Sequence, residues 1–423
     1  MADLRASRIL APELETRPPE AHREFLSGQL ARIVAHAYAN APRFRRNLDA
    51  AGISAAEVRS LDDLEKLPVL RKDDLLGMQS EEPPFGGLLA VPPERLARIF
   101  MSPGPLFDPQ GTSDDFWRFK PALAASGFHA GDIVQNAAAY HLTPLGFMLD
   151  SALRSLGCVV IPAGPGQTEL QIRIASHVGA TGYVGLPSFL RILMTKAREA
   201  GVRLRIEVAF VLGEMLPESL RSELEQEFGV RVLQGYGTAD LGLLAYECPE
   251  KGGWHVHPEA IVEILDLETG RAAPPGQTGQ IVATIFDEDY PLIRFATGDL
   301  SALAPPARCP CGRTAPKLLG LLGRVGDAVK VKGMFVRGTQ LDEVMRKFPE
   351  VTAWQAVVAR EGHNDRLTYR VQLGEGVAQP EELAAKLAEA LREAVIVRGE
   401  VEIVPPGGVP PNAKKIDDRR VWK

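Results

Sequence analysis

Thiol and imidazole side chains gather in two short polar segments of the chain. Cys248 precedes His255 in the first segment, and Cys309 and Cys311 form a Cys-x-Cys pair in the second. Three thiolates and one imidazole can hold a tetrahedral Zn²⁺, and such a closed set leaves no position for substrate. The pattern therefore favours a structural zinc site, with separate reduced thiols in loops as the alternative. His255 and His257 alternate along an extended segment, so at most one of them should bind the metal.

Polar segments follow apolar runs at three further places. They are Gly213-Glu214 after 208–212, Gly235-Tyr236-Gly237-Thr238-Ala239-Asp240 after 232–233, and Thr297-Gly298-Asp299 after 293–295. Loops at the carboxyl ends of parallel strands bind ligands in open α/β sheets. An aromatic ring can stack on a base, one carboxylate can bind both ribose hydroxyls, and another can hold Mg²⁺. Each segment alone is also an ordinary turn, but their order along the chain indicates a nucleotide site.

Short apolar runs alternate with helical stretches from residue 132 to residue 233, after a helical lead-in over 21–55. This alternation predicts an α/β fold with a doubly wound, mostly parallel sheet covered by helices. Between 260 and 300 the pattern changes to strands separated by turns, which predicts a β-rich, antiparallel subdomain. After Gly323, apolar strands and a helix over 380–394 predict a small α+β unit.

Composition excludes several classes of protein. The 423 residues carry a net charge of -6, which argues against a protein that coats nucleic acid or an anionic membrane. No apolar run reaches the roughly 18 residues of a membrane helix, and the first twenty residues carry acids and prolines where a secretion signal needs an apolar stretch. We therefore expect a cytoplasmic protein with no membrane partner. With four cysteines, a disulfide framework is not expected, and Cys158 in an apolar strand reads as a core residue.

Taken together, these motifs resemble the adenylate-forming enzymes and, among them, the phenylacetate-CoA ligase branch. The segment 235–240 resembles the adenine and Mg²⁺ loop, 297–299 the ribose motif, and 323–327 the junction to a mobile C-terminal domain. The segment 135–137, with 157–158, Pro162 and 166–169, resembles the acyl-pocket region of the same branch. The likeness covers most of the chain. It implies a large N-terminal domain over 1–323, which binds AMP and the acyl group, and a C-terminal lid over 324–423.

The resemblance implies a two-step reaction. A carboxylate attacks the α-phosphate of ATP to give an acyl-adenylate and pyrophosphate, and the thiol of coenzyme A then displaces AMP. The expected ligands are ATP and AMP, coenzyme A, Mg²⁺, structural Zn²⁺ and a small aromatic or short substituted carboxylic acid. No nucleic-acid partner is implied, and a homodimer is allowed because members of the branch are often dimers.

The resemblance also gives roles to individual residues. Tyr236 would stack on adenine, with Gly235 and Gly237 in its loop; Gly213 and Glu214 would line the base and acyl pocket; Asp299 and Arg324 would hold the ribose; Asp240, with Thr238 beside it, would bind Mg²⁺. Ala138, Ala139, Tyr140 and His141 would line the acyl pocket, and Tyr140 could cap an aromatic ring. Cys248, His255, Cys309 and Cys311 match positions at which members of the branch can hold zinc.

Lys415 carries the expected catalysis, and Gly326 the expected motion. Lys415 resembles the catalytic lysine, whose charge would offset the charge on the carboxylate and the α-phosphate. Lys414 competes for that alignment, and a solvated basic tail is the structural alternative. Gly326 lies at the expected hinge, where glycine accepts almost any backbone angle.

The chain also departs from the family pattern. The stretch 100–113 corresponds to a phosphate loop that is normally rich in Ser, Thr and Gly and carries a lysine, but here three prolines remove N–H donors and Asp108 adds a negative charge. Ala239-Asp240 stands where Ser or Thr precedes Glu, and Gly326 stands where an acidic residue is common. A non-catalytic protein that binds nucleotide or acyl-CoA is therefore the alternative function. A metal-centred hydrolase is a remote third reading, because a closed zinc site holds no activated water.

Overall fold

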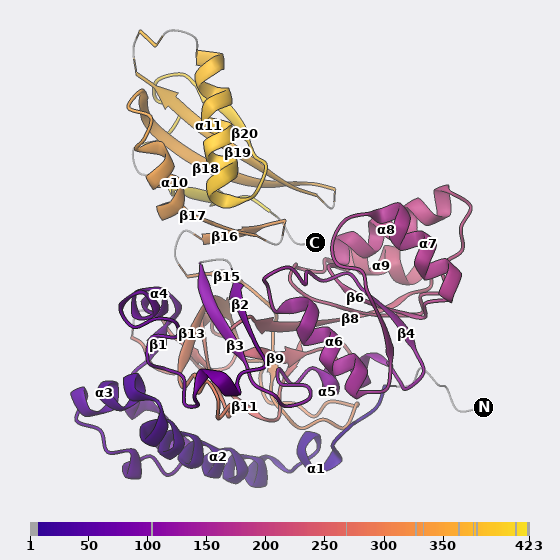
Figure 1. The fold of residues 1–423 in the computed structure, drawn as a ribbon, viewed down its shortest axis with the longest axis vertical. Helices are drawn as coiled ribbons and strands as arrows, with labels where there is room; N and C mark the ends of the chain where they lie inside the picture. Colours follow the sequence, from indigo (N-terminus) through magenta and orange to yellow (C-terminus); the bar gives the residue numbers. More distant parts are fainter. Residues whose placement is uncertain are drawn as a thin grey trace. The chain divides into compact units, whose positions relative to one another are not determined.

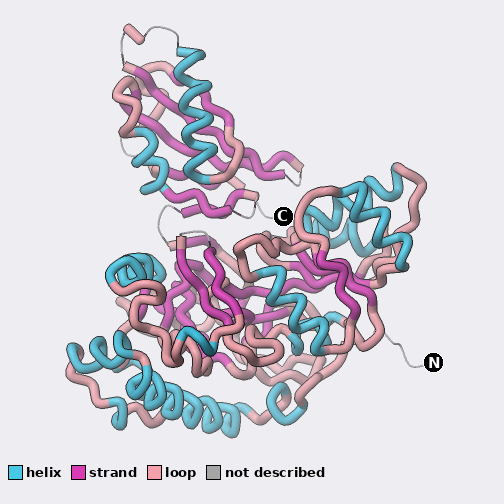
Figure 2. Tube along the Cα trace, viewed as in Figure 1, coloured by secondary structure: helices cyan, strands magenta, loops and turns pink. Residues whose placement is uncertain are grey.

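The computed structural model describes residues 7–102, 105–267, 269–325, 328–332, 334–362, 364–374, 376–377, 380–410 and 413–420. The fold divides into two compact units. The first holds residues 1–216 and 221–323, and the second holds 324–423 with the short segment 217–220. Figures 1 and 2 show the helices and strands of both units.

An eight-stranded sheet forms the centre of the first unit, in the order β14-β10-β9-β8-β7-β6-β4-β5. Its parallel part consists of β4 (Ile133–Asn136), β5 (Val159–Pro162), β6 (Gly182–Gly185), β7 (Val208–Val211) and β8 (Arg231–Thr238). The covering helices are α5 (Lys120–Ser126), α6 (Leu145–Ser155), α7 (Thr168–Val178), α8 (Pro187–Glu199) and α9 (Glu218–Gln226). In Figure 1, α5 and α6 lie on one side of these strands and α7 and α8 on the other. The predicted doubly wound sheet is confirmed.

Antiparallel strands extend this sheet past β8. They are β9 (Gly242–Tyr246), β10 (Trp254–Val256) and β14 (Lys317–Leu318). The segment 235–240, expected as a loop, is therefore mostly strand, because β9 turns back and pairs with β8 as far as Thr238. A bulge between Tyr236 and Gly237 shifts the register there, and such a bulge re-aims the side chains around it.

A second sheet in the first unit has the order β1-β13-β12-β11 and corresponds to the β-rich subdomain predicted from 260 to 300. Its strands are β1 (Leu70–Arg71), β11 (Ala260–Leu265), β12 (Gly279–Ile285) and β13 (Phe295–Ser301). The three later strands are antiparallel, and β1 joins β13 in parallel. The segment 297–299, also expected as a loop, is part of β13, because its register with β12 resumes at Leu300.

Helices and a hairpin complete the first unit. The helices are α1 (Pro12–Glu15), α2 (Pro19–Asn40), α3 (Pro42–Ala50) and α4 (Lys72–Glu81), with 3₁₀ turns η1 (Ala55–Glu57), η2 (Leu61–Lys66) and η3 (Pro93–Arg95). Strands β2 (Arg98–Ser102) and β3 (Leu106–Gln110) form a two-stranded antiparallel hairpin. The stretch that corresponds to the phosphate loop is therefore a paired hairpin, whose tip residues 103–104 lie outside the described ranges.

The second unit is a small α+β fold. Its main sheet has the order β20-β19-β18-β21, built on the long hairpin of β18 (Val351–Glu361) and β19 (Asn364–Leu373). The other elements are β16 (Ala328–Val331), β17 (Met334–Arg337), α10 (Gly338–Met345), α11 (Pro380–Val395), β20 (Glu400–Val404) and β21 (Ile416–Asp418). Strand β15 (Gly323–Arg324) begins with the last residue of the first unit and pairs with β13. Buried Leu387, Leu391 and Val395 of α11 pack in one core with Tyr369 of β19.

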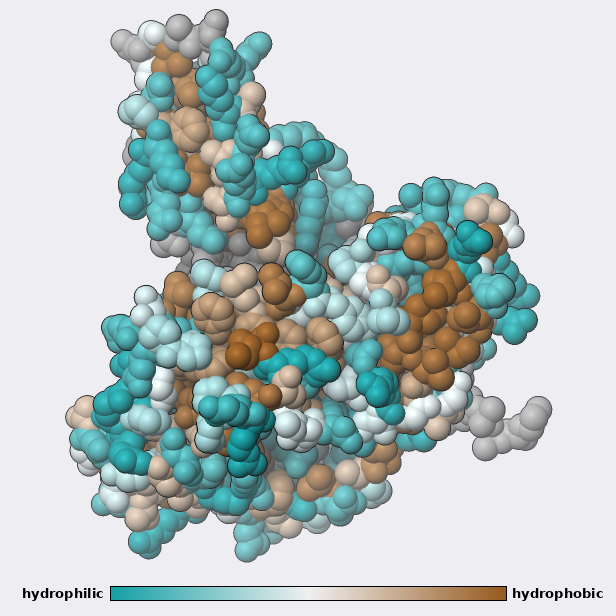
Figure 3. Space-filling model, in the orientation of Figure 1, coloured by the Kyte–Doolittle hydropathy of each residue, from teal (hydrophilic) through white to brown (hydrophobic). Residues whose placement is uncertain are grey.

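Apolar side chains are exposed on the helical end of the first unit. Leu170, Ile174 and Val178 repeat every four residues along α7, and Val159 is exposed on the edge strand β5. Figure 3 shows apolar surface over this region. In the part of the chain that the structure describes, no helix combines the length and the apolarity that a membrane crossing needs.

Candidate nucleotide and metal sites

The expected adenine and ribose residues meet in the first unit. The hydroxyl of Tyr236, on β8, donates a hydrogen bond of 2.9 Å to Oδ2 of Asp299, on β13. One face of the Tyr236 ring stacks on Trp254, with 6.0 Å between ring centroids and 14° between planes. Two sheets that are remote in sequence thus bring an aromatic ring and a carboxylate into contact.

Glycines make this approach possible. A Cβ atom on Gly235 would lie 2.3 Å from Cζ of Phe210, and one on Gly237 would lie 2.4 Å from the carbonyl oxygen of Gly242. A side chain at Gly235 would therefore displace the Phe210 ring, and one at Gly237 would push against the backbone of β9. Gly298, between Thr297 and Asp299, has a φ of 79°, in the left-handed region that glycine favours.

The hydroxyls in both motifs serve the backbone. Thr238 Oγ1 accepts a hydrogen bond from the N–H of Leu241 at 3.1 Å, and Thr297 Oγ1 accepts one from the N–H of Asp299 at the same distance. These turns fix the loop after β8 and the kink of β13. The hydroxyl of Thr238, which precedes Ala239 and Asp240, therefore shapes the turn.

Asp240, the expected Mg²⁺ ligand, lies in a buried ion pair. Its Oδ2 is 2.7 Å from Nζ of Lys72, the first residue of α4, and its side chain is 0% exposed. Its Oδ1 is buried and has no hydrogen-bond partner among the described residues. Carboxylate oxygens are the ligands that Mg²⁺ prefers, so an unpartnered oxygen here fits that ion. The sequence analysis missed Lys72, since one lysine in the charged run 71–74 carries no distinguishing signal.

Gly213 and Glu214 follow β7, as predicted. Gly213 has a φ of 84°. Oε2 of Glu214 accepts a hydrogen bond from Ser188 Oγ at 2.6 Å, and its carbonyl accepts one from Nε2 of Gln234 at 3.0 Å. These bonds hold the loop between α8 and β8.

The expected acyl-pocket residues lie between β4 and α6. Nδ2 of Asn136 donates to the Tyr140 hydroxyl at 2.7 Å, and that hydroxyl donates to Oδ2 of Asp150 at 3.1 Å. Ala138 is buried, Ala139 and Tyr140 are half-buried, and His141 is exposed. The Tyr140 ring meets Phe147 edge to face, with 5.2 Å between centroids. The structure thus fixes the Tyr140 ring from two sides.

The four expected zinc ligands come together. The ligand atoms of Cys248, His255, Cys309 and Cys311 all lie within 4.8 Å of one another. The sulfur atoms of Cys248 and Cys309 are 3.7 Å apart, and Cys311 Sγ lies 3.5 Å from His255 Nε2. His257 lies apart from this cysteine cluster, and its Nδ1 accepts a hydrogen bond from the N–H of Glu259 at 3.1 Å.

The chemistry of the cysteine cluster fits a metal. Nδ1 of His255 lies 3.0 Å from the carbonyl of Ala315, a contact that aims Nε2 at the thiols. Burial lowers the pKa of His255 to about 4, which keeps the imidazole in the neutral form that binds metals. Burial, with the charge of Cys311 adding to it, raises the pKa of Cys248 to about 12, and a bound cation would reverse that cost.

A buried ion pair ties the N-terminal segment to the cysteine cluster. Nε of Arg313 donates to Oε2 of Glu15 at 2.7 Å, and the two side chains are 2% and 1% exposed. The hydroxyl of Tyr246 donates to the same oxygen at 3.0 Å, and the N–H of Arg313 donates to Cys311 Sγ at 3.4 Å.

The remaining expected site residues belong to the second unit. Nζ of Lys415 lies 4.4 Å from the centre of the Trp354 ring and 3.3 Å from Oδ1 of Asp342. The neighbouring Lys414 side chain is exposed, and its carbonyl accepts a hydrogen bond from Gln355 at 3.0 Å. Arg324 begins this unit, so it and Asp299 are described in different units. The expected hinge, Gly326, lies outside the described residues.

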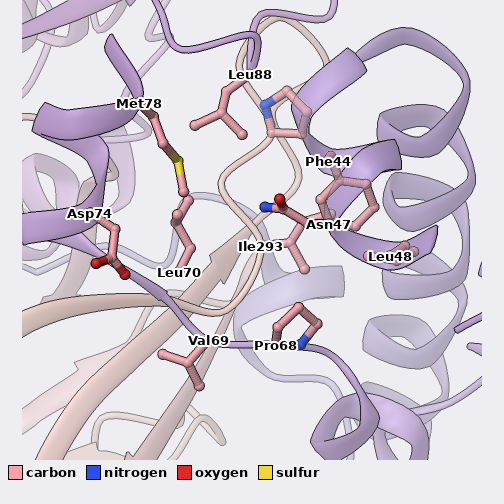
Figure 4. A pocket seen from close by; sticks show the side chains of 11 residues that line it. Phe44, Asn47, Leu48, Pro68, Val69, Leu70, Asp74, Met78, Leu88 and Ile293 are labelled. Atoms are coloured by element: carbon pink, nitrogen blue, oxygen red, sulfur yellow. The ribbon is translucent and has the colours of Figure 1, made fainter. Parts of the chain in front are cut away.

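The first unit also has a pocket that contains none of the expected site residues. It lies between α3 and α4 and is lined mainly by apolar side chains such as Phe44, Leu70, Met78 and Ile293, with Asn47 and Asp74 as polar members (Figure 4).

Comparisons with known proteins agree with this arrangement. Residues 118–284 match the AMP-binding enzyme family, and residues 333–421 match the AMP-binding enzyme C-terminal domain. The phenylacetate-coenzyme A ligase of Thermus thermophilus is 32% identical over 94% of this chain and 96% of its own. The enzyme of the same name from Aromatoleum evansii is 30% identical over 96% of this chain and 97% of its own.

A solved structure agrees with the fold. The crystal structure of 2-hydroxyisobutyryl-CoA ligase with its acyl-adenylate and CoA covers 97% of this chain and 92% of its own, with a TM-score of 0.87 at 24% identity. The comparisons support the enzyme prediction over a non-catalytic binding protein. The chain belongs to the AMP-binding enzyme family and, within it, to the branch of AMP-forming acid–CoA ligases that includes the phenylacetate-coenzyme A ligases.

Proposed function

We propose that this protein is an ATP-dependent ligase that joins a small aromatic or short substituted carboxylic acid to coenzyme A. In the first step a carboxylate oxygen bonds to the α-phosphorus of ATP, and pyrophosphate leaves. In the second step the sulfur of coenzyme A bonds to the acyl carbon, and AMP leaves. The names of the phenylacetate-coenzyme A ligases support an aromatic acid.

One observation carries the proposal. The Tyr236 hydroxyl and Asp299 Oδ2 are 2.9 Å apart although 63 residues separate them in the chain. This contact brings together the adenine motif 235–240 and the ribose motif 297–299, which would have to lie side by side to bind one nucleoside. The Asp299 carboxylate would accept hydrogen bonds from the ribose hydroxyls. Adenine would stack beside the Tyr236 ring, on the side away from Trp254.

The other residues of the first unit would bind and orient the substrates. Gly213 and Glu214 would border the base, and Ala138, Ala139, Tyr140 and His141 would border the acid. Thr238 would hold the loop that carries Asp240, and Asp240 would bind Mg²⁺, which when bound with ATP offsets phosphate charge. Arg324 would join Asp299 at the ribose.

Lys415 would serve the first step only. Its ammonium would stabilise the negative charge that builds between the attacking carboxylate and the α-phosphate. Within its own unit, the Trp354 ring and Asp342 support this lysine over Lys414, because they hold its side chain in a defined position. Gly326 would act as the hinge between the two steps.

The zinc assignment is also part of the proposal. Cys248, His255, Cys309 and Cys311 would hold one Zn²⁺ in a closed, structural site, and their ligand atoms within 4.8 Å of one another support it. The ion would tie β10 to the segment after residue 308.

Pyrophosphate release over a panel of carboxylic acids tests the function. The panel should hold arylacetic, benzoic and short hydroxy acids, with zinc-loaded, folded protein and Mg²⁺-ATP. We expect release with at least one acid, and a thioester when coenzyme A is added. Silence with every acid would refute the proposal.

Two further parts of the proposal concern the cell and the assembly. We expect a cytoplasmic enzyme, since ATP and coenzyme A are its substrates, and the family resemblance allows a homodimer. Sedimentation equilibrium at micromolar concentration tests the dimer, and a single species at the mass of one chain would refute it.

A further inference from the structure

The hairpin of β2 and β3 offers little to a polyphosphate. Its backbone groups pair across the two strands. Its sequence holds one cation, Arg98, whose guanidinium donates to Oε1 of Gln110 at 3.1 Å and lies over the ring of Phe147. Burial raises the pKa of Asp108 to about 7, so above that pH its charge would repel a phosphate. The positive charge that a triphosphate needs must therefore come from another element.

Lys72 is a cation that lies beside both nucleotide motifs. Strand β1 pairs in parallel with β13, with Arg71 opposite Ala296, so Lys72 follows the strand at the level where the ribose motif 297–299 begins. Its Nζ lies 2.7 Å from Oδ2 of Asp240, at the end of the motif 235–240. The backbone of Lys72 is therefore next to one motif, and its side chain contacts the other.

The Lys72 ammonium has room for a second anionic partner. An ammonium has three N–H donors, and within the described residues this one makes a single hydrogen bond, to Asp240. The side chain of Lys72 is 14% exposed, whereas that of Asp240 is 0% exposed, so the cation of this pair is the member that meets solvent. A phosphate oxygen can therefore bind the ammonium while the pair with Asp240 is kept.

We propose that Lys72 binds a phosphate oxygen of ATP, so that helix α4 supplies the cation that the hairpin lacks. The proposal rests on the proposed function, which makes ATP a substrate and pyrophosphate a product. Lysine binds phosphate as a point charge and needs no paired geometry. The bond to Asp240 holds the ammonium in place before ATP arrives, which lowers the entropy cost of forming the contact.

A purely structural role for Lys72 makes a different prediction. In that case the ammonium only neutralises the buried Asp240 carboxylate, and its loss costs stability. Ligands with and without phosphate would then be affected alike. A direct contact with phosphate instead strengthens the binding of ATP and inorganic pyrophosphate and leaves adenosine unaffected.

Isothermal titration calorimetry of the zinc-loaded full chain, without a carboxylic acid, tests the contact. The ligands are ATP with Mg²⁺, inorganic pyrophosphate and adenosine. We expect Lys72→Met to raise the dissociation constants of ATP and pyrophosphate at least about tenfold and that of adenosine less than about twofold. Lys72→Arg keeps the charge, so it should restore most of the lost affinity. Arg71→Met is the matched control, because it removes the same charge from an exposed neighbour, and it should bind all three ligands as the wild type does.

A second pair of variants separates the phosphate contact from the ion pair. In Asp240→Asn the buried carboxylate is gone, so Lys72 has no charge to neutralise there. Adding Lys72→Met to that variant should still weaken pyrophosphate binding at least about fivefold in magnesium-free buffer. Neither protein buries an unpaired carboxylate at position 240, so this comparison remains available if Lys72→Met alone does not fold, which thermal unfolding establishes.

Three results would overturn the proposal. They are unchanged affinity for ATP and pyrophosphate in Lys72→Met, an equal loss in Arg71→Met, and an equal loss for adenosine. The measurements need no turnover. Pyrophosphate binding that depends on Lys72, in a protein that adenylates no acid, would refute the proposed function and leave this contact standing. Adenylation by the wild type, with unchanged ATP affinity in Lys72→Met, would do the reverse.

Discussion

At the scale of single residues, the buried carboxyl of Asp108 links protonation to stability. In the unfolded chain it loses its proton near the ordinary pKa of 3.8, but in the folded protein only near 7. Between these values the folded state holds the additional proton, so this group makes the protein less stable as pH rises from about 4 to about 7. Above that range the full penalty is present.

We therefore expect Asp108→Asn to stabilise the protein at alkaline pH, in metal-free and nucleotide-free buffer. The gain in the free energy of unfolding should grow by roughly 2 kcal/mol between pH 5.5 and pH 8. Urea unfolding at both pH values measures it. A gain that is the same at both values would contradict the assignment of this pKa to Asp108.

Tyr236 illustrates how far single residues could be predicted from the sequence. The order of the motifs 235–240 and 297–299 along the chain predicted that the Tyr236 ring and the Asp299 carboxylate lie together, and the structure brings both into contact. The stacking of Trp254 on that ring could not be predicted, because it depends on the pairing of β10 with β9. Lys72 was missed for the same reason: its partner Asp240 is 168 residues away.

At the scale of elements, apolar runs identified the strands of the parallel sheet, but not where strands continue through polar segments. The segments 235–238 and 297–299 read as loops because glycine, threonine and aspartate form turns. Pairing with β9 keeps 235–238 extended, and pairs with β12 on either side of 297–299 hold that segment within β13, and such pairing is invisible in the local sequence. The hairpin at 98–110 also depends on a contact that the local sequence does not reveal, because Gln79 on α4 binds its second strand.

A buried ion pair forms part of the contact between the N-terminal segment and the cysteine cluster. Arg313→Met removes the charge partner of Glu15, whose side chain is 1% exposed, so we expect a loss of roughly 3–5 kcal/mol in the free energy of unfolding. Arg191→Met is the control, because that arginine is 35% exposed in its pair with Glu223, and we expect it to cost less than about 1 kcal/mol. Urea unfolding of both variants measures the difference, and equal losses would argue against a special role for the Arg313 pair.

The cysteine cluster gives a second prediction at this scale. Cys309→Ser removes one of four ligands, so we expect the purified protein to lose most of its zinc and to unfold at a lower temperature. Cys158→Ser is the matched control, because its buried thiol bonds to the carbonyl of His129 at 3.3 Å, away from the cysteine cluster. Metal analysis by mass spectrometry and a thermal melt decide it. Full zinc content in Cys309→Ser would exclude this set of ligands.

At the scale of the whole molecule, the residues proposed for the chemistry are divided between two units. Asp240 and Asp299 belong to the first unit and Lys415 to the second. We expect Lys415→Ala to slow adenylation by a factor of about 100 or more, because it removes a fixed charge at the reacting phosphate. Thioester formation from synthetic acyl-adenylate should change little.

The neighbouring residue Lys414 provides the control for this prediction. Lys414→Ala removes an exposed side chain of the same charge, so both half-reactions should keep wild-type rates. Rapid-quench measurement of each half-reaction separates the steps. An equal loss in both steps for Lys415→Ala, or a loss of adenylation in Lys414→Ala, would move the catalytic role elsewhere.

The bond between Glu15 and Arg313 has a consequence for biosynthesis. The two residues are 298 positions apart, and β1 likewise finds its partner only when β13 exists. A ribosome that adds roughly 5–20 residues per second therefore leaves the start of the chain unpartnered for many seconds. The apolar side of the first helices must stay shielded during that interval, so yield from a cell should depend on chaperones that hold nascent chains.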